Sequence, residues 1–238
     1  MKLFRVTLTG ADDSVQPEQI ISLSEKYPWV EWGILFSKKS MGNPRYPSKE
    51  WIGLLEKAGE GKNLHLSAHI CGRWVRDICQ GEWTILPTFP VIVTDLFKRI
   101  QLNFHCYRHK IKEQSFFEPF QVPMLAAKQM IFQMDGVNGK LLEIAQANDI
   151  NAVPLFDQSG GAGRLPNEWP KAGEYSVCGY AGGLSPDNVE GQIKNIQSCS
   201  QGLVWIDAET RVRSDDDQIF DMERVEQFLK NAAPYMEE

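Results

Sequence analysis

Two glycine-rich segments bring together side chains and backbone groups that could bind and transform an anion. The first segment reads LFDQSGGAGRLPNEW, in which Asp157 closes a short apolar run and Gly160, Gly161 and Gly163 follow it. Glycines allow backbone N–H groups to come close to a ligand, and the carboxyl group of Asp157 could act on that ligand. The alternative is a plain turn capped by Asp157, since Asp and Gly also dominate turns.

The second segment reads GYAGGLSPDNV and predicts an anion site. Gly182 and Gly183 precede Ser185 and Pro186, which we expect to be the cap and the first residue of a helix. N–H groups at such a helix start point outward at the positive end of the helix dipole. An anion bound there would lie close to Gly182 and Gly183.

A third segment, HLSAHICG, supplies candidate bases. The period-two alternation of a strand places His69 and Cys71 on one face near its end, and His105 follows the next strand along the chain. One alternative is a histidine that is simply hydrogen-bonded inside the fold. A zinc site formed by these three residues and Asp157 is another, but no short-spaced ligand pair supports it, and we expect no metal.

The elements that position these residues follow from alternating apolar runs and helical stretches. We predict strands at residues 3–9, 32–36, 64–70, 99–104, 130–134, 152–156, 176–180 and 203–207. We predict helices at residues 17–26, 48–58, 84–98, 112–127, 139–148, 186–197 and 221–233. Strand–helix alternation with apolar strands is typical of a parallel sheet covered by helices.

A closed barrel suits this pattern better than an open sheet. The chain reads GADDSV after the first strand, where a dinucleotide-binding sheet would carry GxGxxG, so we expect no cofactor. Eight strand–helix repeats within 238 residues, without a visible linker, predict one α/β domain over residues 1–238, a (β/α)₈ TIM barrel of eight parallel strands. Catalytic groups of such barrels lie at the C-terminal ends of the strands.

The composition of the chain limits the classes of binding partner. The formal net charge of −6 argues against the basic surface that nucleic-acid binding needs. No apolar stretch is long enough for a membrane span, and the N-terminus does not resemble a signal peptide. We therefore expect a cytoplasmic protein, a monomer or homodimer, whose partner is a small anionic metabolite and neither nucleic acid nor membrane.

Four motifs resemble the phosphoribosylanthranilate isomerase family. The two glycine-rich segments resemble its strand-6 and strand-7 motifs, GILFSKKSMGNPRYPS resembles its strand-2 motif, and RIQLNF its strand-4 motif. The resemblance implies a (β/α)₈ barrel and an Amadori rearrangement in which Asp157 is the general acid. It also implies that Arg45 orients a substrate carboxylate, and that Gly182 and Gly183 donate to a substrate phosphate.

Two positions depart from the family pattern. Thr9 stands where the family has its general base, a cysteine, and an alcohol without an adjacent base holds its proton at neutral pH. Glu209 and Arg211 replace small residues of the phosphate cradle. Either these two residues pair and fill the cradle, or Arg211 or Arg213 binds the anion in place of backbone groups.

The sequence thus predicts an isomerase-type enzyme that moves protons on a small anionic metabolite, with or without a phosphate. Asp157 would be the acid, and His69 or Cys71 would be candidates to replace the missing base. The alternative is an inactive relative that binds a metabolite or a partner protein. Retention of Asp157 favours the enzyme, whereas loss of the cysteine favours the binding protein.

Overall fold

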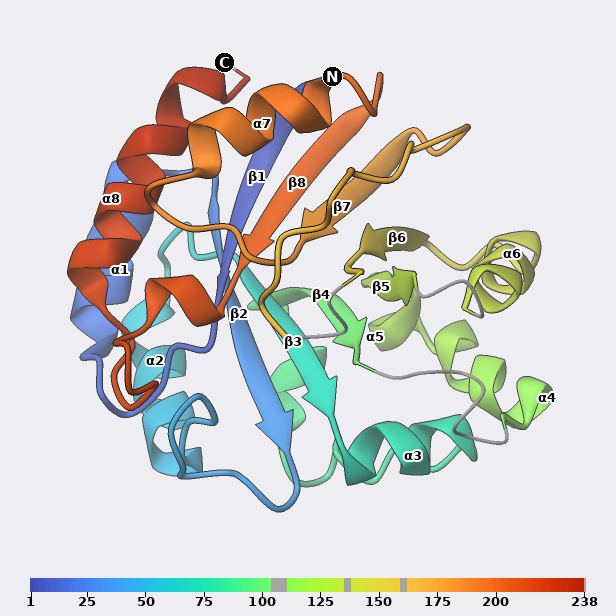
Figure 1. Cartoon of the computed structure of the whole chain (residues 1–238). Helices are drawn as coiled ribbons and strands as arrows, with labels where there is room; N and C mark the ends of the chain where they lie inside the picture. The colour runs from blue at the N-terminus through green and yellow to red at the C-terminus, as the bar shows by residue number, and fades with distance from the viewer. Residues whose placement is uncertain (104–110, 135–137, 159–161, 238) are drawn as a thin grey trace.

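The apolar runs of the sequence form the strands of a closed β-barrel. The structure, a computed structural model, describes residues 1–103, 111–134, 138–158 and 162–237. Within these ranges, eight parallel strands pair in chain order and β8 pairs back to β1, which closes a (β/α)₈ TIM barrel (Figure 1). The strands are β1 (Lys2–Thr9), β2 (Val30–Ser37), β3 (Leu66–Cys71), β4 (Phe97–Leu102), β5 (Gln129–Met134), β6 (Ala152–Phe156), β7 (Val177–Ala181) and β8 (Leu203–Ala208).

Helices surround the strands and bury their apolar stripes against them (Figure 1). They are α1 (Pro17–Lys26), α2 (Lys49–Gly59), α3 (Arg73–Cys79), α4 (Glu113–Phe117), α5 (Pro123–Ala126), α6 (Gly139–Ala147), α7 (Val189–Gln197) and α8 (Met222–Ala232). Ser48 and Asp221 begin α2 and α8, because their side chains accept hydrogen bonds from N–H groups of the first turn. None of the helices in the described ranges has the length and apolar character that crossing a membrane requires.

The barrel interior is partly apolar and partly charged. Ile131, Val153, Leu155 and Trp205 form an apolar cluster inside the barrel. Beside it, Glu31 accepts hydrogen bonds from Thr7 Oγ1 at 2.9 Å and from Arg99 Nη1 at 2.8 Å. The guanidinium of Arg99 lies 4.0 Å from the ring centre of Trp205.

Two predicted helices are wrong. Residues 84–98 contain no α-helix: the short 3-10 helix η1 (Pro90–Val93) and the start of β4 lie there, and α3 comes earlier in the chain. Residues 112–127 break into α4, the 3-10 helix η3 (Glu118–Gln121) and α5. Prolines explain both errors, since a proline within a helix removes a hydrogen bond and clashes with the preceding turn.

Candidate functional site

Side chains at the C-terminal ends of the strands surround a small cavity, which we call the mouth cavity. Its volume is about 60 Å³, and its polar lining includes His69 of β3, Gln101 of β4, Asp157 after β6, and Asp207 and Glu209 from β8 and the loop that follows. The barrel therefore brings residues from widely separated parts of the chain to one point, as expected for this face of the fold.

Asp157 lies at the edge of the barrel interior and is largely buried. It follows β6 directly and lines the mouth cavity. Gln133 Nε2 of β5 lies 3.4 Å from Asp157 Oδ2. Gly160 and Gly161, expected beside it, lie outside the described residues.

Thr9, at the end of β1, contacts a carboxyl group that sequence reasoning missed. Thr9 Oγ1 donates a hydrogen bond to Asp207 Oδ1 at 2.8 Å. Burial raises the pKa of Asp207 well above its usual range, and the nearby negative charges of Glu209, Glu31 and Asp157 act in the same direction, against the hydrogen bond from Thr9. The hydroxyl at position 9 thus has an acid–base group beside it. The sequence signal that could have identified Asp207 as a site residue is its position at the end of an apolar strand.

Gly33 of β2 makes room for this arrangement. A Cβ atom at Gly33 would lie 2.2 Å from Thr9 Oγ1 and 2.9 Å from His69 Cε1. Because no side chain stands there, the side chains of β1 and β3 occupy the space over β2. A residue larger than glycine would force Thr9 or His69 to move.

His69 and Gln101 present unpaired polar atoms. Both side chains are buried, with relative exposures of 1% for His69 and 3% for Gln101. Among the described residues, neither His69 Nε2 nor Gln101 Oε1 has a hydrogen-bond partner. Burial, assisted by Arg99, lowers the pKa of His69 to about 3, so that its ring is neutral at physiological pH.

Cys71 does not fit the role of a base. Its sulfur accepts a hydrogen bond from Asn103 Nδ2 at 3.2 Å, and it does not line the mouth cavity. Burial raises the pKa of the Cys71 thiol to about 12, so that it keeps its proton at neutral pH. His105 lies outside the described residues, and within those that are described no group of three or more metal-ligating side chains could hold a metal ion.

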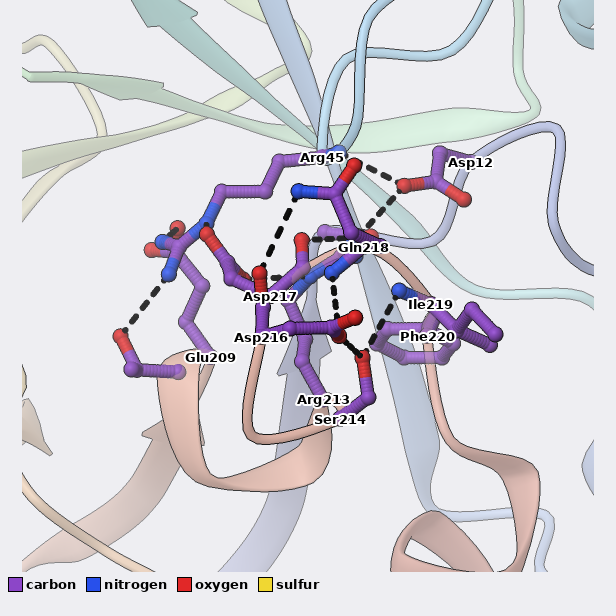
Figure 2. Close-up of polar contacts among 12 residues, drawn as sticks. Asp12, Arg45, Glu209, Arg213, Ser214, Asp216, Asp217, Gln218, Ile219 and Phe220 are labelled. Atoms are coloured by element: carbon purple, nitrogen blue, oxygen red, sulfur yellow. Dashed lines mark hydrogen bonds and ion pairs between the residues drawn. The ribbon is translucent and has the colours of Figure 1, made fainter.

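Arg45 is held by carboxylates of the loop after β8 (Figure 2). Its Nη1 donates to Glu209 Oε1 at 2.5 Å and its Nε donates to Asp217 Oδ2 at 2.6 Å, while Nη2 lies 3.4 Å from Thr210 Oγ1. Of the two alternatives for Glu209, pairing with Arg211 is not what the structure shows: the side chain that reaches Glu209 is that of Arg45, from a loop far away in sequence. Arg45 does not line the mouth cavity, and each of its guanidinium nitrogens has a protein partner.

Arg213 connects the loops around Arg45 and does not line the mouth cavity. It is fully buried, and it donates to Asp12 Oδ2 at 2.8 Å, to Asp217 Oδ1 at 2.8 Å and to the carbonyl oxygen of Gly10 (Figure 2). Asp12 in turn accepts the backbone N–H of Arg45 at 2.6 Å. Asp217 bridges both arginines, so the loops after β1, β2 and β8 form one ionic network.

A larger open cleft of about 880 Å³ adjoins the mouth cavity and shares Gly163, Gly183 and Arg211 with it. We call it the outer cleft. It lies between residues 163–165, residues 183–188, Arg211 and the first turns of α8. Arg211 is exposed and lines both spaces, so that of the two arginines considered for an anion only this one is in position.

The loops beside the outer cleft touch each other closely. Gly183 has a φ of +67°, and a Cβ there would lie 2.3 Å from the backbone nitrogen of Leu165. Gly182 lines the mouth cavity next to it. The expected capping by Ser185 is wrong: α7 begins at Val189, and the N–H of Ser185 donates to Asn188 Oδ1 at 2.9 Å. The Asn188 side chain thus engages one of the N–H groups that the sequence assigned to an anion.

Comparisons with known proteins agree on the fold. No protein-family model and no curated protein matches the chain. N-(5'-phosphoribosyl)anthranilate isomerase from Pyrococcus furiosus superposes with a TM-score of 0.55 at 14% identity, over 97% of this chain and 99% of that one. Phospho-2-dehydro-3-deoxyheptonate aldolase from Thermotoga maritima gives a TM-score of 0.55 at 12% identity, over 98% of this chain and 69% of that one.

Identities this low support the TIM-barrel fold alone. The two similar structures are named for different chemistry, an isomerase and an aldolase. A barrel fold hosts many reactions, so the reaction has to be argued from the residues at the mouth.

Proposed function

We propose that the protein is an enzyme similar to the phosphoribosylanthranilate isomerases that moves protons on a small anionic metabolite. Asp157 is the general acid, and Asp207, assisted by Thr9, is the general base. The observation that carries the proposal is the presence of both carboxyl groups on one cavity, with the Thr9 hydroxyl hydrogen-bonded to Asp207 at 2.8 Å.

Asp207, in contact with Thr9, can take the role of the general base that the missing cysteine has in the family. A general base must be strong enough to take a proton from carbon, and a raised pKa makes a buried carboxylate a stronger base than an exposed one. Burial has this effect on the pKa of Asp207. In the proposed cycle Asp207 takes a proton from a substrate carbon, and Asp157 protonates a heteroatom whose bond opens while it stays within the molecule, which is an isomerisation. Proton exchange with water then restores both carboxyl groups.

The anionic part of the substrate belongs in the outer cleft. Arg211 borders both spaces, so a ligand whose reacting carbon lies at Asp207 can extend past Gly183 toward that guanidinium. Arginine binds phosphate or carboxylate through two parallel hydrogen bonds. Gly182 and Gly183 can add backbone N–H groups to the same anion.

Solvent exchange tests the proposal without knowledge of the substrate. Small phosphorylated aldoses, ketoses and amino sugars are incubated with the protein in D₂O, and loss of C–H signals is followed by proton NMR. We expect exchange in at least one compound, and a fall of roughly 10²-fold or more in Asp157→Asn and in Asp207→Asn. Asp95→Asn, a fully exposed carboxylate before β4, is the matched control and should exchange at the wild-type rate.

A binding protein without catalysis is the second candidate. The contact between Arg45 and Glu209 favours it, because the guanidinium that the family resemblance assigns to a substrate carboxylate is already engaged. Binding of a compound without any solvent exchange, or exchange that is unaffected in both Asn variants, would overturn the enzyme proposal and leave this one.

A further inference from the structure

We propose that the mouth cavity binds a primary ammonium group, so that the ligand is an amine at its inner end and an anion at its outer end. This rests on the proposed function only in using the same site. The inference follows from the acidic lining of the cavity, from two unpaired buried atoms on residues that line it, and from its size.

The lining of the mouth cavity is acidic. Asp157, Asp207 and Glu209 all line the mouth cavity, and Arg211 at its outer boundary is the one cation among the described lining residues. Arg45 compensates Glu209 through one carboxylate oxygen from outside the cavity. Carboxyl groups that share a site of low dielectric constant repel each other, and a bound cation removes that repulsion.

The unpaired atoms are suited to accept hydrogen bonds. Gln101 Nε2 donates to Asn103 Oδ1 at 2.8 Å, which leaves the amide oxygen Oε1 without a partner among the described residues. His69 Nε2 is likewise unpaired there, on a ring that is neutral. A buried acceptor without a partner costs free energy that a donating ligand recovers. An ammonium group carries three donors and no acceptor, whereas a carboxylate can only accept.

The size of the mouth cavity suits a small head group. A cavity of about 60 Å³ has room for an ammonium group and the carbon that bears it. Within the described parts of the chain, the carboxylates and the imidazole are not grouped as a metal site. We place the remainder of the ligand toward the outer cleft, where Arg211 can bind an anion.

Two probes of equal length separate an ammonium head from a carboxylate head. O-phosphoethanolamine and 2-phosphoglycolate both end in a phosphate and differ in the group that would enter the mouth cavity. By isothermal titration calorimetry at pH 7.5, we expect the full chain to bind O-phosphoethanolamine at least about tenfold more tightly.

Two variants test the residues behind the preference. Glu209→Gln removes one negative charge and leaves the charge of Arg45 less compensated, so it should weaken O-phosphoethanolamine and strengthen 2-phosphoglycolate, each by about fivefold or more. Gln101→Leu removes the unpaired acceptor without changing charge, and should weaken O-phosphoethanolamine alone. Glu56→Gln, an exposed position on α2, makes the same charge change as Glu209→Gln at a distant surface and should leave both affinities unchanged.

The wild-type comparison decides even if one variant does not fold. Equal or tighter binding of 2-phosphoglycolate overturns the inference, and so does failure of both probes to bind. If the ammonium probe is preferred while no compound exchanges protons in D₂O, the inference holds and the proposed catalysis fails. If substrates without an amino group exchange protons and 2-phosphoglycolate binds more tightly, the proposed catalysis holds and the ammonium inference fails.

Discussion

At the scale of single residues, the hydroxyl of Thr9 and the carboxyl group of Asp207 have acid–base properties that neither has alone. The hydroxyl lowers the pKa that burial raises in Asp207, and the carboxyl group fixes the direction of the hydroxyl. In the proposed mechanism, the balance between these opposing influences sets how strong a base Asp207 is. A change at position 9 should therefore be felt as a change in pH dependence.

Thr9→Val should move the pH profile of the reaction upward. Valine keeps the shape of threonine but cannot donate to Asp207 Oδ1, so the carboxylate loses a charge-assisted hydrogen bond worth about 1.5 kcal/mol, or about one pH unit. The pH–rate profile of solvent exchange measures the shift. Thr9→Ser retains the donor and should follow wild type, and a profile that is identical in all three proteins would contradict the assigned coupling.

His69 should make the fold sensitive to acid. Its folded pKa of about 3 lies below the unfolded value of 6.5, so the unfolded chain binds more protons between these pH values. The stability that neutral His69 allows is complete above pH 6.5 and is lost progressively as the pH falls toward 3. The total loss in the free energy of unfolding is roughly 3–5 kcal/mol.

Urea unfolding across this range compares wild type with His69→Gln and Asp207→Asn. His69→Gln should flatten the loss of stability on acidification. Asp207 has the opposite sign, because its raised pKa means that the folded state binds more protons above the unfolded value and loses stability as the pH rises. Asp207→Asn should therefore steepen the loss on acidification, and two variants that change the slope in the same direction would refute this assignment.

At the scale of elements, the loops after β6 and β7 depend on a close backbone contact. Gly183→Ala would combine a strained positive φ with a Cβ placed 2.3 Å from the nitrogen of Leu165. We expect a loss of stability of about 1–3 kcal/mol and weaker binding of inorganic phosphate to the outer cleft, measured by thermal unfolding and calorimetry.

Gly191→Ala in α7 is the matched control for Gly183→Ala. No atom lies within 4 Å of a Cβ built at Gly191, and alanine is the better helix former. It should be neutral or stabilising by up to about 1 kcal/mol, with phosphate binding unchanged. A neutral effect of both substitutions would show that the two loops do not rely on the contact.

The elements also show what the sequence can and cannot predict. Residues 17–26 and 152–156 match α1 and β6 at both ends, because caps and apolar runs are local signals. The segment at 84–98 misleads, since its apolar periodicity outweighed two prolines in the prediction. The pairing of Glu209 with Arg45 is beyond local reasoning: the two residues meet only because β2 and β8 end at the same mouth.

At the scale of the whole molecule, a buried ion pair contributes to the packing of the barrel. Glu31 and Arg99 lie on β2 and β4 and face each other across the interior, with side-chain exposures of 1% and 6%. Their mutual attraction offsets the loss of hydration of both charges. Removal of one partner leaves the other charge buried without its ion-pair partner, which is the more costly state.

Arg99→Met should destabilise the fold by about 3–5 kcal/mol, whereas the double variant Arg99→Met with Glu31→Leu should recover most of the loss. Denaturant unfolding of the two single variants and the double variant gives the coupling energy through a double-mutant cycle. Additive losses would mean that the pair contributes no coupling to stability, despite its 2.8 Å separation.

The empty position at Gly33 makes the chemistry of this barrel fragile on the evolutionary timescale. A single nucleotide change converts a glycine codon into one for alanine, and the added methyl group would stand 2.2 Å from the Thr9 hydroxyl. We expect such a substitution to move the Thr9 hydroxyl away from Asp207. Under the proposed function, a single methyl group would then separate an enzyme from a protein that only binds, and selection for catalysis would act on a glycine that takes no part in the reaction.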